Sequence, residues 1–200
     1  MVGSFSVTWD YLCPFARNAH EHLAAALQAG AGWDVHFSFF SLSQVHLAEG
    51  EPAVWDDPER YPGVLAGLAG IVVRDRVPER FLDAHMALFA ARHDDGLDLR
   101  DRHVVSQALK AADVDGAAVL DEVDAGWPVE RARAEQDEAL QRWAVFGVPT
   151  FIVDEKAVFV RFMHRPDGDA ELARTTIGRV LDLVEGFPEL NELKYTKIPR

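Results

Sequence analysis

The sequence has a single cysteine, Cys13, in 200 residues, so an intramolecular disulfide is impossible. This excludes a small scaffold held by disulfide bonds and is typical of proteins from a reducing compartment. No apolar run approaches the roughly 18 residues of a membrane helix. The N-terminal residues MVGSFS lack the basic and apolar segments of a signal peptide. We therefore expect a cytoplasmic protein with no membrane partner.

Basic residues are also scarce, because 20 Lys and Arg face 33 Asp and Glu for a formal net charge of −13. Nucleic acids and anionic membranes bind positive surfaces, so neither is an expected partner. The chain has no glycine-rich phosphate loop and no Rossmann fingerprint, and we expect no nicotinamide or ATP. The composition gives no indication of an oligomeric state.

The eight histidines do not form a recognisable metal site. His20 and His22 stand two positions apart on an expected helix and point to different faces, and no cysteine or carboxylate cluster completes a ligand set. His46 and His164 fall in expected loops. Each is either a solvated loop residue or an acid or base near Cys13.

The order of elements predicts an α/β fold. Apolar and polar residues alternate over 4–9 and again over 33–39, as in strands, and a helical pattern covers 14–29 between them. Such a β-α-β unit implies parallel neighbouring strands. Residues 44–146 show several helical patterns and no good strand pattern. Two short apolar runs, 150–153 and 158–162, then predict a hairpin. A last helix over 169–184 is expected to bury Leu172, Ile177, Val180, Leu181 and Val184.

Cys13 stands where the first strand gives way to the first helix. Pro14 suits the first position of a helix, which makes Cys13 the N-cap. The N–H groups of Phe15 and Ala16 and the helix dipole would then stabilise a thiolate. We therefore expect the pKa of Cys13 to lie below its usual value of about 8.5. The alternative is a buried structural cysteine packed as a small apolar residue.

The Cys13-Pro14-Phe15 junction and the later element Val148-Pro149-Thr150 together resemble the thioredoxin superfamily, in particular its DsbA-like branch. The resemblance implies a thioredoxin-like domain formed by 1–43 and 147–200, with an inserted α-helical domain at 44–146. It also implies that Pro149 is cis and faces the cysteine. Val148, Pro149 and Thr150 would then bind the backbone of a thiol-bearing substrate beside Pro14, Phe15 and Ala16.

Within that branch the sequence is similar to cytoplasmic DsbA-family oxidoreductases of actinobacteria, including the mycothiol-dependent nitroreductase type. It is also similar to 2-hydroxychromene-2-carboxylate isomerases and kappa-class glutathione transferases. Ala16 occupies the position of the second cysteine in dithiol members, so this protein cannot use a catalytic cycle that forms an intramolecular disulfide. The resemblance therefore implies a monothiol site. It implies no tightly bound cofactor, and mycothiol or glutathione as a co-substrate.

Three functions remain open. The leading hypothesis is monothiol exchange, in which Cys13 attacks a disulfide or electrophilic small molecule and an external thiol releases it. The second is a thiol-dependent isomerase or transferase, and the third is a binding module without turnover. Trp9, Asp10 and Tyr11 are candidates for a pocket around Cys13, although core packing for Trp9 and turn capping for Asp10 are simpler roles.

Overall fold

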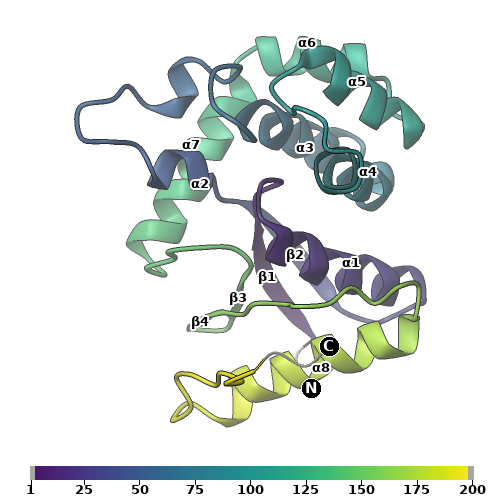
Figure 1. Cartoon of the computed structure of the whole chain (residues 1–200), viewed down its shortest axis with the longest axis vertical. Coiled ribbons are helices and arrows are strands. Elements are labelled where there is room, and N and C mark those ends of the chain that lie inside the picture. The colour runs from purple at the N-terminus through teal and green to yellow at the C-terminus, as the bar shows by residue number, and fades with distance from the viewer. Residues whose placement is uncertain (1–2, 198–200) are drawn as a thin grey trace.

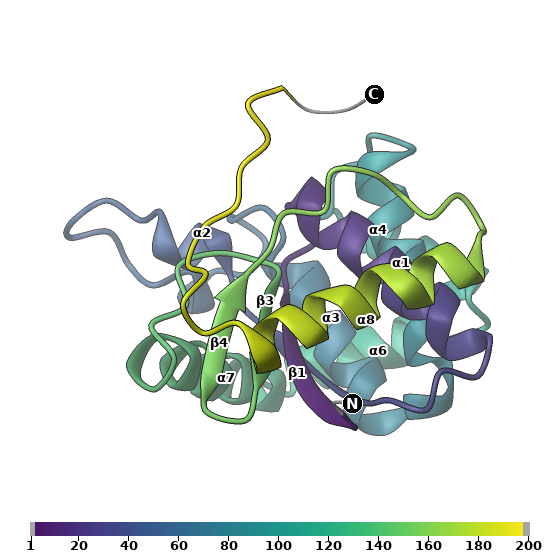
Figure 2. The same cartoon turned by 90° about the horizontal axis from the view of Figure 1, so that it is seen from below.

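The computed structural model describes residues 3–197 and contains one four-stranded sheet with the strand order β2-β1-β3-β4. In the view of Figure 1 the helices α3 to α6 lie above the sheet and α8 lies below it, and Figure 2 shows α8 lying alongside α1. The strands are β1 (Ser4–Trp9), β2 (Asp34–Phe39), β3 (Thr150–Val153) and β4 (Lys156–Phe159).

The first β-α-β unit is confirmed. β1 pairs in parallel with β2, and α1 (Pro14–Gln28) connects them. Phe5, Val7 and Trp9 are almost fully buried, as expected for the apolar face of a strand at the centre of a sheet. β1 also pairs antiparallel with β3, with Val7 opposite Phe151. This pairing brings the second half of the chain against the cysteine-bearing half.

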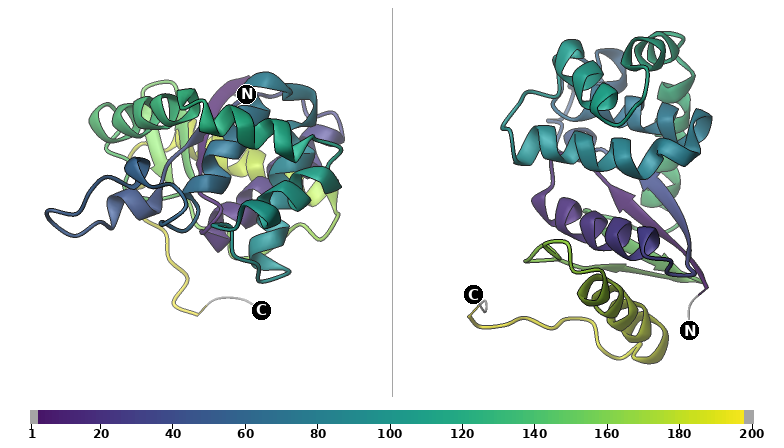
Figure 3. Two further views of the ribbon diagram at one scale, coloured as in Figure 1. Left: turned by 90° about the horizontal axis from the view of Figure 1, so that it is seen from above. Right: turned by 90° about the vertical axis from the view of Figure 1, so that its right-hand side faces the viewer.

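The middle of the chain is helical in the described residues, and Figure 3 shows its helices gathered above the sheet. α3 is buried continuously from Val64 to Val73 and forms the centre of this group. Glu135 of α7 accepts hydrogen bonds from the backbone N–H of Phe39 at 2.7 Å and from the Arg74 guanidinium at 2.7 Å, which ties α7 to α3 and β2. The helices are α2 (Leu42–Val45), α3 (Val64–Arg76), α4 (Phe81–His93), α5 (Arg102–Ala111), α6 (Gly116–Asp124) and α7 (Trp127–Gln141), with single 3-10 turns at Val54–Asp56 and Pro78–Arg80.

The C-terminal part differs from the prediction in two details. The second hairpin strand begins at Lys156 and ends at Phe159, earlier than expected, because Asp154 adopts a positive φ of 51° and allows a two-residue turn. In α8 (Ala170–Gly186), Leu172 is 47% exposed and not buried as predicted. The buried stripe instead runs at helical spacing through Ala173, Ile177, Leu181 and Val184, and Leu172 stands off it.

Across residues 3–197, no helix combines the length and the apolar character needed to cross a bilayer.

Candidate active site

Cys13 occupies the N-cap of α1, as its place before Pro14 predicts. Its backbone is extended (φ −89°, ψ 116°), and its Sγ accepts a hydrogen bond from the N–H of Ala16 at 3.5 Å. Its own N–H donates to the carbonyl of Asp10 at 3.1 Å, which closes the turn before the helix. The residue is only 8% exposed, so Cys13 is almost completely buried.

The segment that carries Pro149 lies directly against this sulfur. Cys13 Sγ donates a hydrogen bond to the carbonyl oxygen of Val148 at 3.2 Å, and the Val148–Pro149 peptide bond is cis. Thr150 fixes the segment, since its N–H donates to Thr8 Oγ1 at 2.9 Å and its hydroxyl to the Gly147 carbonyl at 2.8 Å. Cys13 and Val148, which are 135 positions apart in the sequence, are therefore in direct contact.

The expectation of a lowered thiol pKa is wrong. Burial raises the pKa of Cys13 above its ordinary value, and hydrogen bonds from the N–H groups of Ala16 and Phe15 and the charge of Arg161 only partly oppose the rise. The negative charge of Asp10 raises it further. A donated S–H bond to Val148 requires the protonated thiol. The geometry thus describes a resting thiol that must lose its proton before it can attack.

Asp10 holds the turn that presents Cys13. Its two carboxylate oxygens accept from the backbone N–H groups of Leu12 at 2.8 Å and Leu42 at 2.7 Å. Burial nevertheless raises its pKa to about 6, with the two backbone hydrogen bonds and the charge of His46 acting in the opposite direction. Gly63 packs against this turn with a φ of +80°, and a Cβ there would lie 2.8 Å from Leu12 Cγ. The turn-holding role of Asp10 is thus the one that the structure shows.

Trp9 and Tyr11 have no exposed surface, so neither lines a pocket open to solvent. Tyr11 Oη hydrogen bonds to His85 Nδ1 at 2.8 Å, His85 Nε2 to His20 Nδ1 at 2.9 Å, and His20 Nε2 to the carbonyl of Thr8 at 3.1 Å. A carbonyl can only accept, so His20 Nε2 must donate to it. His85 Nε2 then donates to His20, and Tyr11 donates to His85. Each imidazole is neutral in this chain, and burial lowers the pKa of both histidines, to about 4 for His20.

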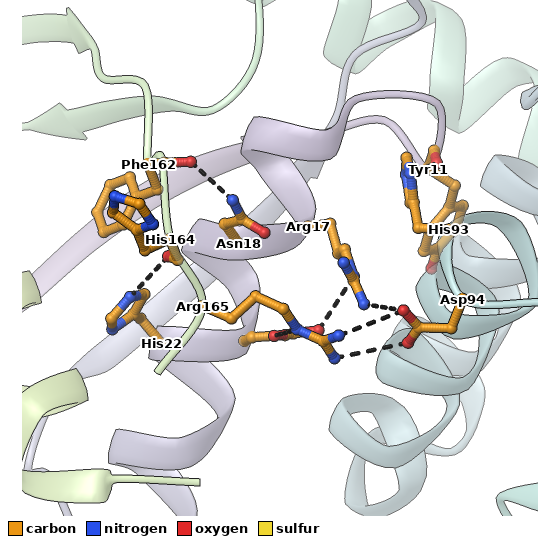
Figure 4. Close-up of polar contacts among 10 residues, drawn as sticks. Tyr11, Arg17, Asn18, His22, His93, Asp94, Phe162, His164 and Arg165 are labelled. Atoms are coloured by element: carbon orange, nitrogen blue, oxygen red, sulfur yellow. Dashed lines mark hydrogen bonds and ion pairs between the residues drawn. The ribbon is translucent and has the colours of Figure 1, made fainter. Parts of the chain in front are cut away.

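Further contacts secure the start of α1 to its neighbours (Figure 4). His93 Nε2 hydrogen bonds to the carbonyl of Tyr11 at 2.9 Å. Arg17 and Arg165 each pair with both Glu21 and Asp94, forming a cluster of four charges between α1, α4 and the segment after β4. We call these four residues the charge cluster.

Neither of the two candidate loop histidines bonds to the thiol. Within residues 3–197 Cys13 Sγ accepts from backbone N–H groups in the first turn of α1 and donates to the Val148 carbonyl. His46 follows α2 at the surface and acts on Asp10 only through its charge. The carbonyl of His164 accepts a hydrogen bond from His22 Nε2 at 3.2 Å. No three His, Cys, Asp or Glu side chains in the described part of the chain are placed to hold a metal ion.

Besides Phe15, two aromatic residues and one arginine lie near the start of α1 or the cis-proline segment and were not among the predicted site residues: Phe146, Phe159 and Arg161. Phe146, two residues before Val148, is 70% exposed and lies 5.1 Å from Phe159, measured between ring centroids. The guanidinium carbon of Arg161 lies 5.7 Å from the ring centroids of both Phe15 and Phe159. In the sequence, only the short distance of Phe159 and Arg161 from Pro149 could have suggested that they belong to the site. The pairing of β3 with β4 is what brings them close to the cis-proline segment.

Comparisons with known proteins agree with this architecture. Residues 79–164 match the family model of the DSBA-like thioredoxin domain, a range that includes α4 to α7 and both hairpin strands but not Cys13. An uncharacterized protein of Mycobacterium tuberculosis, Rv2286c, is 24% identical over 192 residues, which is 96% of this chain and 81% of that protein.

Solved structures match over most of the chain. The cytosolic disulfide reductase DsbM from Pseudomonas aeruginosa with GSH has a TM-score of 0.61 at 18% identity, covering 90% of this chain and 100% of that one. Reduced DsbA1 from Neisseria meningitidis has a TM-score of 0.58 at 19% identity, covering 90% and 83%. Oxidised BdbD from Bacillus subtilis has a TM-score of 0.56 at 19% identity, covering 90% and 87%. The chain therefore has the DsbA-like thioredoxin fold that its motifs predicted, with Cys13 as its single cysteine.

Proposed function

We propose that this protein is a monothiol oxidoreductase that exchanges disulfides with a low-molecular-weight thiol in the cytoplasm. The observation that carries the proposal is the contact of Cys13 Sγ with the Val148 carbonyl, at the N-terminus of α1 and beside cis-Pro149. The DsbM structure with GSH, from a cytosolic disulfide reductase, supports a small thiol as partner and a cytoplasmic location.

The proposed cycle needs no second cysteine in the chain. Cys13 loses its proton to solvent, and the thiolate attacks one sulfur of a disulfide R–S–S–R′. A bond forms between Cys13 Sγ and that sulfur, the S–S bond breaks, and the electron pair leaves with R′–S⁻, which takes up a proton. The thiolate of an external R–SH then attacks the bound R sulfur, releases R–S–S–R and restores the Cys13 thiolate. The substrate disulfide is reduced and the external thiol is oxidised.

The residues around Cys13 have separable roles in this cycle. The N–H of Ala16 already points at the sulfur and would stabilise the thiolate when it forms. Val148, Pro149 and Thr150 would form the wall against which the incoming thiol's backbone lies, and Pro14 and Phe15 the opposite wall. Loss of the S–H bond to Val148 on ionisation frees that carbonyl to accept from the substrate.

Mass spectrometry of the intact protein tests the proposal. After incubation with oxidised glutathione or oxidised mycothiol, the wild type should gain the mass of one thiol moiety, and excess free thiol should remove it. The Cys13→Ser variant should gain nothing. Adduct formation should accelerate as pH rises, because burial raises the pKa of Cys13 and little thiolate is present at neutral pH.

One observation favours a second candidate, a binding module without turnover. A buried thiol with a raised pKa reacts slowly, as expected if Cys13 served only in packing. Absence of any adduct at pH 9 with both disulfides would favour this second function and exclude the first.

A further inference from the structure

We infer that Arg161 is a binding group for a carboxylate of the partner thiol, so that the protein selects an anionic thiol of the glutathione kind over an uncharged one such as mycothiol. The inference rests on the proposed function, and it names the chemical class of the co-substrate and a residue that selects it.

The fold places Arg161 at the mouth of the site. Phe159 pairs with Thr150 across the hairpin, and the N–H of Val160 donates to the carbonyl of Pro149 at 3.2 Å. The chain after β4 is therefore held against the cis-proline segment, and Arg161 is the next residue. Its guanidinium lies over the ring of Phe15, which is two residues after Cys13. Arg161 thus spans the opening between the start of α1 and the end of β4.

The charge of Arg161 is available to a ligand. The residue is exposed, and no carboxylate in residues 3–197 lies within 4.0 Å of its guanidinium nitrogens. By contrast, Arg17 and Arg165 are both neutralised by Glu21 and Asp94. The chain has a formal net charge of −13, and Arg161, which has no carboxylate partner among residues 3–197, provides a local positive charge that acts on Cys13 and that an anion would meet.

The aromatic contacts of Arg161 define the geometry of this group. The rings of Phe15 and Phe159 lie at equal distances from the guanidinium carbon, 5.7 Å, and restrict where the side chain can go. A guanidinium held by ring contacts keeps its N–H donors free for the bidentate bonds that carboxylates accept. Glutathione carries two carboxylates, whereas mycothiol carries none. The charge of Arg161 therefore distinguishes the two thiols.

The test compares rates of Cys13 modification by oxidised glutathione and by the disulfide of glutathione diethyl ester, in which both carboxylates of each glutathione unit are esterified. Because both reagents meet the same thiolate fraction, the ratio of the two rates cancels any change in the pKa of Cys13. We expect Arg161→Gln to lower the glutathione-to-ester ratio about three- to tenfold, as loss of one nearby charge predicts. Arg161→Lys should keep most of the preference, and added salt should weaken it in the wild type.

Arg174→Gln is the matched control, since it removes one exposed arginine from α8 and should leave the ratio unchanged. A second pair of reagents, the anionic dithiobis(nitrobenzoate) and the neutral dithiodipyridine, should give the same order of preferences. If the glutathione-to-ester ratio is unchanged in Arg161→Gln while Cys13 still reacts, the proposed role of Arg161 is overturned and the proposed function is not. No reaction of wild-type Cys13 with any of the four reagents would instead overturn the proposed function.

Discussion

Asp10 is a fully buried carboxyl group directly before the Tyr11-Leu12-Cys13 turn, and its titration should be visible in the stability of the protein. Burial raises its pKa from 3.8 to about 6, so the folded state binds the proton more tightly than the unfolded state. Its stabilising contribution is complete below about pH 4 and is lost as pH rises through about 6. A shift of this size corresponds to about 3 kcal/mol of unfolding free energy.

Urea unfolding of the wild type and Asp10→Asn between pH 4 and 7 measures this effect. The wild type should lose stability over that range, and the variant should show a much flatter profile. Asp121→Asn, an exposed carboxylate on α6, should keep the wild-type slope. Asp10→Asn should also lower the pKa of Cys13, because the negative charge of Asp10 raises it. Parallel profiles for wild type and Asp10→Asn would show that Asp10 is not the titrating group.

At the scale of elements, the chain from Tyr11 through His85 and His20 fastens α4 to α1 and β1. Tyr11→Phe removes the hydroxyl that donates to His85 Nδ1 and leaves a buried acceptor without its partner. We expect a loss of about 1–3 kcal/mol in unfolding free energy, with no change in the denaturant m-value. Tyr61→Phe is the matched control. The Tyr61 hydroxyl is buried and has no partner within residues 3–197, so its removal should be neutral or stabilising. Equal losses in the two variants would contradict the role of the chain.

The hydrogen bonds from Tyr11 through His85 to His20 could not be predicted from the sequence, although much around them could. Cys13 at a helix N-cap follows from Pro14 alone, and periodicity predicts the first three elements at 4–9, 14–29 and 33–39, within one residue of their observed bounds. The partner of Tyr11 lies 74 positions away, and only the packing of α4 on α1 decides it. The same applies to the pKa of Cys13. Local capping predicts a lower value, but burial, which the rest of the fold produces, raises it.

At the scale of the whole molecule, two groups of elements meet along α1. The sheet with α1 and α8 forms one group, and the helices between β2 and β3 form the other (Figure 3). The charge cluster crosses this junction, because Asp94 follows α4 whereas Arg17, Glu21 and Arg165 belong to the first group. Arg17 also lies one turn after Cys13, and its N–H donates to the Cys13 carbonyl at 3.0 Å. The contacts at this junction therefore include a residue of the first turn of α1, the turn that Cys13 caps.

Asp94→Asn should weaken this junction. The substitution removes the acceptor charge for both Arg17 and Arg165, and the Asp94 side chain is 38% exposed, so solvent screens part of the loss. We expect about 1 kcal/mol less unfolding free energy and a Tm about 2–4 °C lower in dilute buffer. The difference should shrink in 1 M NaCl, because salt screens exposed ion pairs. Asp98→Asn is the control. Within residues 3–197 the ion pair of Asp98 is with Arg100, two positions away on the same segment, so the Tm of this variant should change by less than half as much. Equal Tm values for wild type and Asp94→Asn at low salt would show that the charge cluster does not hold the two groups together.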